Sequence, residues 1–229
     1  MIGSMSVRVI VREAGVSDSP DDLALLDDGE RERAARKRQA APFVTGHALV
    51  RRVLGELLDR DPGSLAFERR CTTCGSERHG KPSVVDAAGW HFSLSYTPGV
   101  AMVAVTEGTE VGVDVEDLTD ADFEGFAGAT LAADEALGFE ALEGHDLLVA
   151  RARVWARKEA VLKATGHGLV VDPSEVLVSG PRDSPALVDW RATEPRPSAI
   201  SIADVDLTAT DHRAAVAGLT AQPLDVVVG

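Results

Sequence analysis

The sequence predicts an α+β protein, because strand-like and helix-like segments occur in both halves of its 229 residues. Apolar and polar residues alternate in SVRVIV (6–11), and three further strand-like runs follow at 91–96, 100–105 and 110–116. Two long stretches, 30–58 and 146–165, instead repeat apolar residues at helical spacing. A short polar break (TEGT, 106–109) separates two of the strands. We therefore expect one subdomain at 1–108 and a second at 109–229.

The remaining elements follow from local signals. Pro42 interrupts the first helical stretch, where it would end one helix or occupy the first turn of the next. The part after Pro42 is amphipathic, with Phe43 and His47 on its apolar stripe. A short helix is predicted over 134–142, and Gly166 is suited to end the helix at 146–165. Four later strands are predicted at 175–179, 186–190, 199–205 and 213–218.

Charge and composition exclude several classes of protein. The chain has 23 basic and 37 acidic residues, a formal net charge of −14, which argues against general nucleic-acid binding. No apolar run approaches the ~18 residues of a membrane span. The N-terminal residues lack the apolar core of a signal peptide, and two cysteines make no disulfide framework. We therefore expect a cytoplasmic protein with no membrane partner.

Two acids on one strand are the first candidate site. Asp114 and Glu116 are two residues apart, so their side chains leave the same face of the strand 110–116. Adjacent carboxylates repel unless a proton or a cation lies between them. Hard oxygen ligands suit magnesium, which binds one or two carboxylates together with substrate phosphates. The simpler interpretation is an exposed strand face with two solvated acids.

The helix WARKEAVLKATG (155–166) adds a second candidate. When it is wound at about 100° per residue, Glu159 and Lys158 fall inside the apolar sector, and Lys163 lies at its edge. Charged groups on a buried face need partners, and a metal or an anionic substrate would serve. An ordinary Glu159–Lys163 pair, worth about 0.3–0.5 kcal/mol, is the alternative, but it leaves Lys158 unexplained.

Two shorter motifs have little meaning alone. Gly80, Lys81 and Pro82 form a turn able to present a lysine, and Ser95 with Tyr96 ends the strand FSLSY. A surface turn and a plain strand end are the simpler interpretations. Taken in order, however, GKP, FSLSY, VGVDVE and WARKEAVLKATGHGL resemble the 4′-phosphopantetheinyl transferase superfamily, and most of all its surfactin-synthetase type. The resemblance covers residues 80–169 well and is loose outside them.

The resemblance implies two similar α/β subdomains in a pseudo-two-fold arrangement, with the active site in the cleft between them. It implies transfer of the 4′-phosphopantetheine group of coenzyme A to a serine of an apo acyl or peptidyl carrier protein, releasing adenosine 3′,5′-bisphosphate. Mg²⁺, with Mn²⁺ as a substitute, would be held by Asp114, Glu116 and Glu159. Glu159 would activate the carrier serine, and Lys163 would contact the phosphates.

Coenzyme A contacts are carried over in the same way. They are implied at Gly80, Lys81, Pro82, Ser95, Tyr96, Asp114, Lys163 and Arg33. The sequence departs from the family at Tyr96, where histidine is common, and at Pro42, near which an arginine often stands. Tyrosine can donate a hydrogen bond to phosphate but is uncharged at neutral pH. Arg33, Arg36 and Arg38 are the candidates for the missing positive charge, unless this basic segment is simply a solvated helix.

Other hypotheses stay open at this point. Cys71, Cys74 and His79, with His91 as a distant fourth ligand, resemble half of a zinc knuckle, although a simple turn with free thiols explains them better. A metal-dependent hydrolase of coenzyme A and a non-catalytic binding module are the rival functions. The carrier protein is not named by the sequence. The family favours secondary metabolism and a monomer.

Overall fold

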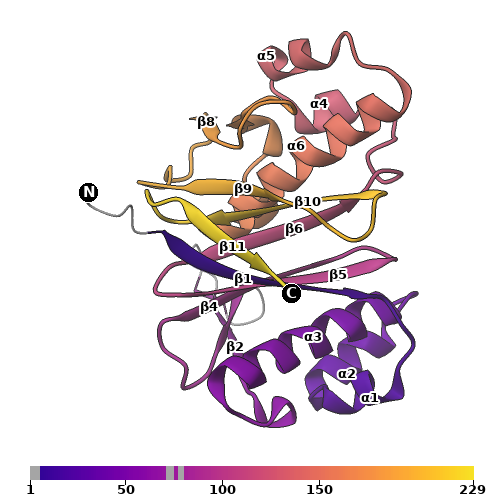
Figure 1. The fold of residues 1–229 in the computed structure, drawn as a ribbon, viewed down its shortest axis with the longest axis vertical. Coiled ribbons are helices and arrows are strands. Elements are labelled where there is room, and N and C mark those ends of the chain that lie inside the picture. Colours follow the sequence, from indigo (N-terminus) through magenta and orange to yellow (C-terminus); the bar gives the residue numbers. More distant parts are fainter. Residues whose placement is uncertain (1–5, 71–74, 77–79) are drawn as a thin grey trace.

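The computed structural model describes residues 6–70, 75–76 and 80–229, and it contains two main β-sheets (Figure 1). The first has the order β11-β1-β5-β4, and the second the order β6-β10-β9. Their strands are β1 (Val7–Gly15), β4 (Trp90–Tyr96), β5 (Val100–Glu107), β6 (Val111–Asp117), β9 (Ser201–Val205), β10 (His212–Gly218) and β11 (Leu224–Val228). Two small hairpins complete the strands: β2 (Phe67–Arg70) with β3 (Lys81–Val84), and β7 (Val176–Val178) with β8 (Leu187–Trp190).

Helices cover the outer face of each sheet, giving four layers (Figure 1). The α-helices are α1 (Pro20–Leu25), α2 (Asp28–Ala35), α3 (Ala41–Leu58), α4 (Phe126–Thr130), α5 (Ala133–Ala136) and α6 (Gly144–Thr165). Short 3₁₀ turns occupy Pro62–Ser64, Leu137–Phe139, Gly168–Val170 and Pro173–Glu175. Helix α3 lies on the first sheet and α6 on the second. None of the helices in the described residues is both long and apolar enough to cross a membrane.

The alternation along each strand explains the layers. Val9 and Met102 of the first sheet and Val113 and Val216 of the second are fully buried in one cluster, so the two sheets pack face to face. The intervening residues of β5 point outward to α3, and those of β10 point to α6. Because side chains alternate, the valines of β6 fill the central core while Asp114 faces α6.

Most of the predicted elements are confirmed. The strands at 6–11, 91–96, 100–105 and 110–116 correspond to β1, β4, β5 and β6, and the four later strands also form. Pro42 lies in the first turn of α3, and Gly166 ends α6 with a left-handed φ of 75°. The helix predicted over 134–142 is wrong in extent, since the structure has only the four residues of α5 followed by a 3₁₀ turn.

Strand β11 was not predicted, and it changes how the chain is connected. It pairs in parallel with β1, so residues from the far end of the chain join the first sheet (Figure 1). Segments on both sides of residue 108 therefore share one sheet. The division at 108 and 109 falls in the turn between β5 and β6 and stays a prediction.

Gly112 brings β6 against α6 more closely than any other residue type could. A Cβ placed on Gly112 would lie 1.9 Å from the carbonyl oxygen of Ala160 and 2.4 Å from the amide nitrogen of Ala164. Backbone therefore packs directly on backbone at this point. This contact sets the separation between Asp114 on the strand and Glu159 on the helix.

Candidate active site

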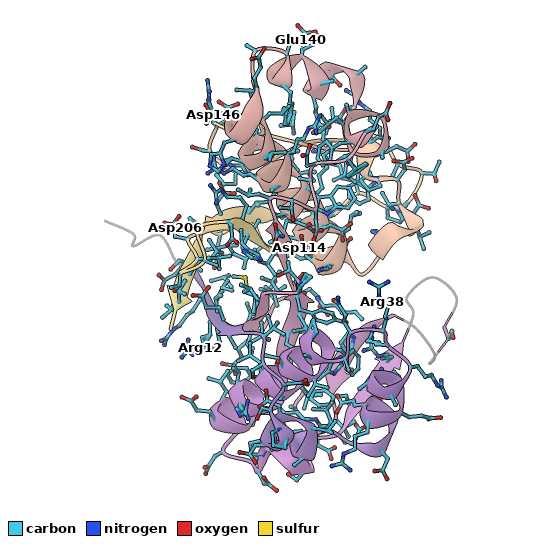
Figure 2. The ribbon with its side chains drawn as sticks, turned by 90° about the vertical axis from the view of Figure 1, so that its right-hand side faces the viewer. Arg12, Arg38, Asp114, Glu140, Asp146 and Asp206 are labelled. Atoms are coloured by element: carbon cyan, nitrogen blue, oxygen red, sulfur yellow. The ribbon has the colours of Figure 1, made fainter. Side chains whose placement is uncertain are left out.

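Asp114 is the central residue of the site, and it is buried with 3% exposure. Figure 2 places it near the middle of the molecule, between the helices of the two chain halves. Its Oδ1 accepts hydrogen bonds from Ser95 Oγ at 2.8 Å and from Lys163 Nζ at 2.6 Å. Its Oδ2 is also buried but has no hydrogen-bond partner. A buried carboxyl group with one oxygen free of hydrogen bonds is suited to a cation.

Glu116 and Glu159 bring two more carboxyl groups toward Asp114. Burial and the charge of Asp114 raise the pKa of Glu116 to about 9. Burial and the charge of Asp114 raise the pKa of Glu159 to about 7. Lys163 lowers both values but offsets only part of the repulsion. Three carboxyl groups thus share one lysine, and the protein without a cation keeps protons on some of them.

These residues fit the divalent cation that the sequence predicts. Asp114 Oδ2 and Glu159 Oε1 are both buried and without a partner, and oxygen donors of this kind are the ligands of Mg²⁺. The three carboxylates lie further apart than the ligands of an occupied metal site. One oxygen from each cannot be chosen so that all three lie within 4.8 Å of one another. A bound cation would have to draw them together.

The group that does meet this distance in the described residues lies elsewhere and consists of Asp117, Asp211 and His212. Both nitrogens of His212 already have partners. Nδ1 is 2.8 Å from Asp211 Oδ1, and Nε2 is 2.9 Å from Thr97 Oγ1. Local hydrogen bonding accounts for this group, and nothing in it requires a metal.

Ser95 and Lys163 form one polar cluster with Asp114. Lys163 Nζ is 3.0 Å from Ser95 Oγ as well as being paired with Asp114. The resemblance implies that Ser95 contacts coenzyme A, and in the structure its hydroxyl donates a hydrogen bond to Asp114, a predicted metal ligand. Ser95 therefore holds the carboxylate in place from the opposite sheet.

A cavity of about 1010 Å³ opens beside this cluster. Its lining contains most of the predicted coenzyme A residues: Arg33, Gly80, Lys81, Pro82, Tyr96 and Lys163. A second hollow of about 490 Å³ is lined by Ser95, Glu116, Arg38 and Pro42, and Tyr96 borders both. The two hollows thus bring together predicted site residues that are up to 130 residues apart in the chain, whereas Asp114 and Glu159 line neither of them.

The other two predicted lysines, like Lys163, have protein partners. Lys81 Nζ pairs with Glu110 and donates to the carbonyl of Val111 at 2.7 Å, and burial lowers its pKa. Lys158 is fully buried and pairs with Glu135 at 2.6 Å. It ties α6 to α5 and to the carbonyl of Pro173, so the structure gives Lys158 a structural role.

The basic segment 33–38 divides between different surroundings. Arg33 lines the large cavity and Arg38 lines the smaller hollow. Arg36, at the C-terminal end of α2, is exposed and pairs with Glu32 of the same helix. Arg33 therefore lies on the wall of the large cavity, and its contact with coenzyme A stays a prediction. Pro42 borders the smaller hollow, where it can supply no positive charge.

Sequence reasoning missed three residues of the large cavity: His47, Arg69 and His167. His47 was taken only as part of the apolar stripe of α3, and Arg69 belongs to the unpredicted β2. His167 was included in the motif after α6 without a role, and its Nδ1 is buried without a partner. An isolated histidine or arginine carries no sequence signal that places it on a cavity wall. Cys71, Cys74 and His79 lie outside the described residues, so the zinc hypothesis stays a prediction.

Comparisons with known proteins show what the chain is similar to. A family model described as the 4′-phosphopantetheinyl transferase superfamily matches residues 110–217. The chain is 31% identical over 160 residues to 4′-phosphopantetheinyl transferase HetI of Nostoc sp., covering 67% of this chain and 65% of the relative. It is 31% identical over 165 residues to a putative 4′-phosphopantetheinyl transferase of Synechocystis sp., covering 69% and 64%. It is also 30% identical over 151 residues to 4′-phosphopantetheinyl transferase psf-1 of Bacillus pumilus, covering 60% and 58%. The chain thus matches slightly less than two thirds of the length of these relatives.

Proposed function

We propose that this chain is a 4′-phosphopantetheinyl transferase that moves the phosphopantetheine arm of coenzyme A to a serine of an apo acyl or peptidyl carrier protein. The observation that carries the proposal is the arrangement of three acids, Asp114, Glu116 and Glu159, beside Lys163, which lies on the wall of the large cavity. All four lie within the residues that match the superfamily. Buried carboxylates that can hold a divalent cation beside a lysine suit a metal-assisted phosphoryl transfer.

Coenzyme A would occupy the large cavity. Lys163 lies on its wall, and the amine is half-buried, so it can donate to the pyrophosphate oxygens once these compete with Asp114. Magnesium, held by Asp114, Glu116 and Glu159, would neutralise the negative charge of the pyrophosphate. The GKP turn, Tyr96 and Arg33 would contact the rest of the nucleotide from the opposite side of the cavity.

The reaction breaks the bond between the β-phosphorus and the bridging oxygen of the coenzyme A pyrophosphate. The serine oxygen of the carrier forms the new bond to that phosphorus, and adenosine 3′,5′-bisphosphate leaves. Glu159 would take the serine proton, directly or through a water molecule. Positioning and charge neutralisation would supply most of the rate enhancement.

The carrier must approach an acidic protein. Carrier proteins are commonly acidic too, so long-range attraction would not drive their encounter with a chain of net charge −14. We propose a contact surface centred on apolar side chains, and exposed Phe123 and Leu137, between β6 and α6, are available for it. An affinity that falls steeply with added salt would contradict this. The surfactin-synthetase type, a pseudo-two-fold arrangement, secondary metabolism, a cytoplasmic location and a monomeric state belong to the same proposal.

The test is an intact-mass measurement on carrier proteins. The chain is incubated with coenzyme A, Mg²⁺ and a panel of apo carriers, and the mass gain of one phosphopantetheine is expected on at least one of them. Glu159→Gln and a chelator should abolish the gain. Asp146→Asn is the matched control, because Asp146 is an exposed acid in the first turn of the same helix.

Each negative result has a meaning. Coenzyme A cleavage without any labelled carrier would replace the transferase with a hydrolase. Coenzyme A binding with neither cleavage nor labelling of any carrier would favour a binding module.

A further inference from the structure

Lys81 is held in a fixed position where the large cavity adjoins the start of β6. Its Nζ donates to Glu110 Oε2 at 2.5 Å and to the carbonyl oxygen of Val111 at 2.7 Å. An ammonium group has three N–H donors, so these two contacts leave one donor over. Because Lys81 also lines the cavity, the third donor is available to a ligand bound there.

Glu110 is held in turn by contacts from two other strands. The Nδ1 of His91 in β4 lies 2.9 Å from Glu110 Oε1, so the two carboxylate oxygens contact different partners. The backbone carbonyl of Glu110 accepts a hydrogen bond of 3.0 Å from the amide of Leu219, the residue that follows β10. The carboxylate of Glu110 is therefore fixed in orientation, and it fixes the Lys81 ammonium.

The carboxyl group of Glu110 is ionised at neutral pH. Burial by itself would raise its pKa, but the hydrogen bond from His91 and the charge of Lys81 lower the pKa to about 2. An ionised carboxylate can only accept, so His91 Nδ1 is the donor in their contact. Glu110 therefore carries a full negative charge beside Lys81, and the pair that they form has no net charge.

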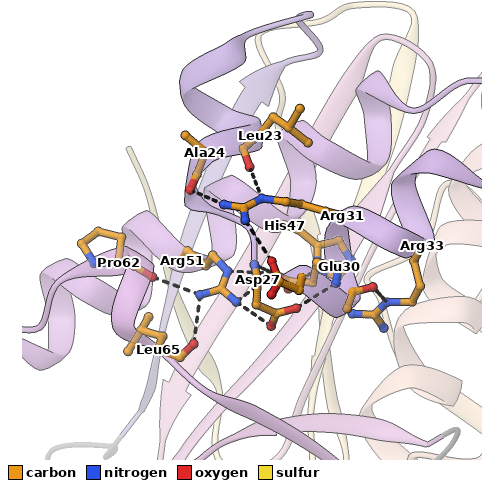
Figure 3. Close-up of polar contacts among 12 residues, drawn as sticks. Leu23, Ala24, Asp27, Glu30, Arg31, Arg33, His47, Arg51, Pro62 and Leu65 are labelled. Carbon is orange, nitrogen blue, oxygen red and sulfur yellow. Dashed lines mark hydrogen bonds and ion pairs between the residues drawn. The ribbon is translucent and has the colours of Figure 1, made fainter.

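Two arginines on the cavity wall are not neutralised in this way. In the part of the chain that the structure describes, Arg33 donates to the backbone carbonyl of Gly29 at 3.3 Å and has no carboxylate partner (Figure 3). Arg69 likewise donates to a backbone carbonyl, that of Gly80 at 3.1 Å. Both arginines line the cavity and bring it positive charge, whereas the charge of Lys81 is matched by an adjacent acid.

Arg51 shows what such a match means when no ligand is involved (Figure 3). It is fully buried and pairs with Glu30 at 2.7 Å and with Asp27 at 2.9 Å. Arg51 is not among the residues that line the cavity, so its charge is matched within the protein for the sake of the fold. Lys81 differs because its charge is matched and it still lines the cavity.

A neutral ion pair acts on a ligand differently from a free cation. A free cation attracts a phosphate over a distance, and added salt screens this attraction. The carboxylate of Glu110 lies 2.5 Å from Lys81 Nζ, so its repulsion of a phosphate offsets most of the attraction by the lysine. What remains is a short-range N–H donor. Such a donor suits an uncharged acceptor, for example a ring nitrogen of a base or a ribose oxygen.

We propose that Glu110 is a positioning residue of the nucleotide site, which holds Lys81 and cancels its charge so that Lys81 donates to an uncharged acceptor of the nucleotide and not to a phosphate. The inference rests on the proposed function in so far as the nucleotide is that of coenzyme A. It gives Glu110 and His91 a part in ligand binding, although neither is among the residues that line the large cavity.

Calorimetry with adenosine 3′,5′-bisphosphate at low and at high salt tests the role of Glu110. Glu110→Gln keeps an oxygen that can accept from Lys81 and removes the negative charge. We expect this variant to bind at least as tightly as the wild type at low salt and to lose several-fold more affinity when salt is added, because the charge of Lys81 is then free. Lys81→Met/Glu110→Gln removes both charges and the donor. It should bind about 3- to 10-fold more weakly, as expected for one lost hydrogen bond, with the salt dependence of the wild type.

Glu107→Gln is the matched control, because it removes one negative charge three residues earlier in the chain. Glu107 is exposed at the end of β5 and lines neither hollow, so its replacement should leave affinity and salt dependence at wild-type values. The side chain of Glu110 is 40% exposed, so its exchange should not prevent folding, and thermal unfolding of each variant checks this.

Two results would overturn the inference. A wild-type salt dependence in Glu110→Gln would show that Glu110 does not cancel the charge of Lys81. Wild-type affinity in the double variant would show that Lys81 does not contact the nucleotide. Both readouts are independent of a carrier protein. If the wild type failed to bind the nucleotide at all, the proposed function would fall as well, so the two failures are seen separately.

Discussion

Replacing Gly112 with alanine tests whether the close packing of β6 on α6 sets the geometry of the acidic site. The added Cβ would lie 1.9 Å from the Ala160 carbonyl oxygen, where contacts under 3.0 Å are essentially never found. Strand and helix must then move apart by about 1 Å, and overpacking of this kind costs about 1–3 kcal/mol. Asp114 lies on the strand and Glu159 on the helix, so the shift separates two predicted metal ligands. A displacement of about 1 Å can cost about 100-fold in rate.

Urea unfolding and steady-state kinetics measure the two effects. We expect Gly112→Ala to unfold at lower urea with an unchanged slope, and to lower kcat/KM for carrier modification by about 100-fold. Gly15→Ala is the matched control. Gly15 is also a strand residue, the last one of β1, but a Cβ at this position would have no atom within 4 Å. That variant should keep wild-type activity.

Wild-type kcat/KM in Gly112→Ala, together with an unchanged urea midpoint, would refute the reasoning. It would mean that the strand and the helix adjust without moving the carboxylates.

Three other perturbations follow from the same structure. The raised pKa values of Glu159 (about 7) and Glu116 (about 9) mean that the folded protein binds more protons than the unfolded chain above pH 4.5, so stability without metal should fall as the pH rises toward 9. Thermal unfolding in a chelator should show this decline, Glu116→Gln should flatten it, and Mg²⁺ should reverse it; a flat wild-type profile would contradict the charge cluster. Lys158→Met should cost about 3–5 kcal/mol in urea unfolding because it leaves the carboxylate of Glu135, whose side chain is only 9% exposed, without its cation. Lys158→Met/Glu135→Gln should recover much of the loss. Lys163→Met should weaken coenzyme A binding, and it should also lower the urea midpoint of the metal-free protein, since it removes the cation beside Asp114; unchanged affinity measured by calorimetry would place Lys163 outside the coenzyme site.

Local sequence signals determined most of the secondary structure. Alternating valines gave β6, and the same alternation put Asp114 on the opposite face from Val113. Pro42 and Gly166 set helix ends because their backbone preferences act within one turn. The short helix near 134–142 was overestimated, since a capping Glu135 that reaches back to the Ala132 amide closes a single turn there.

The acidic site could be predicted from residues whose spacing has a direct geometric meaning. Two acids two apart on a strand must share a face, and Glu159 on the apolar sector of α6 must face that strand. The sequence by itself therefore determined which residues could meet a cation. How far apart they stand depends on Gly112, whose role as a backbone contact appears only when strand and helix are packed together.

The tertiary structure alone decided the partners of the remaining charged groups. Lys81 is paired with Glu110, and Lys158 with Glu135, through contacts 29 and 23 residues apart in the chain. His47 gains its place on the cavity wall because Glu30, held by buried Arg51, binds its Nδ1 across two helices. Likewise β11 joins β1 from the opposite end of the sequence. Periodicity and spacing report which face a residue occupies, but a pairing between distant segments depends on the packed core that brings those faces together.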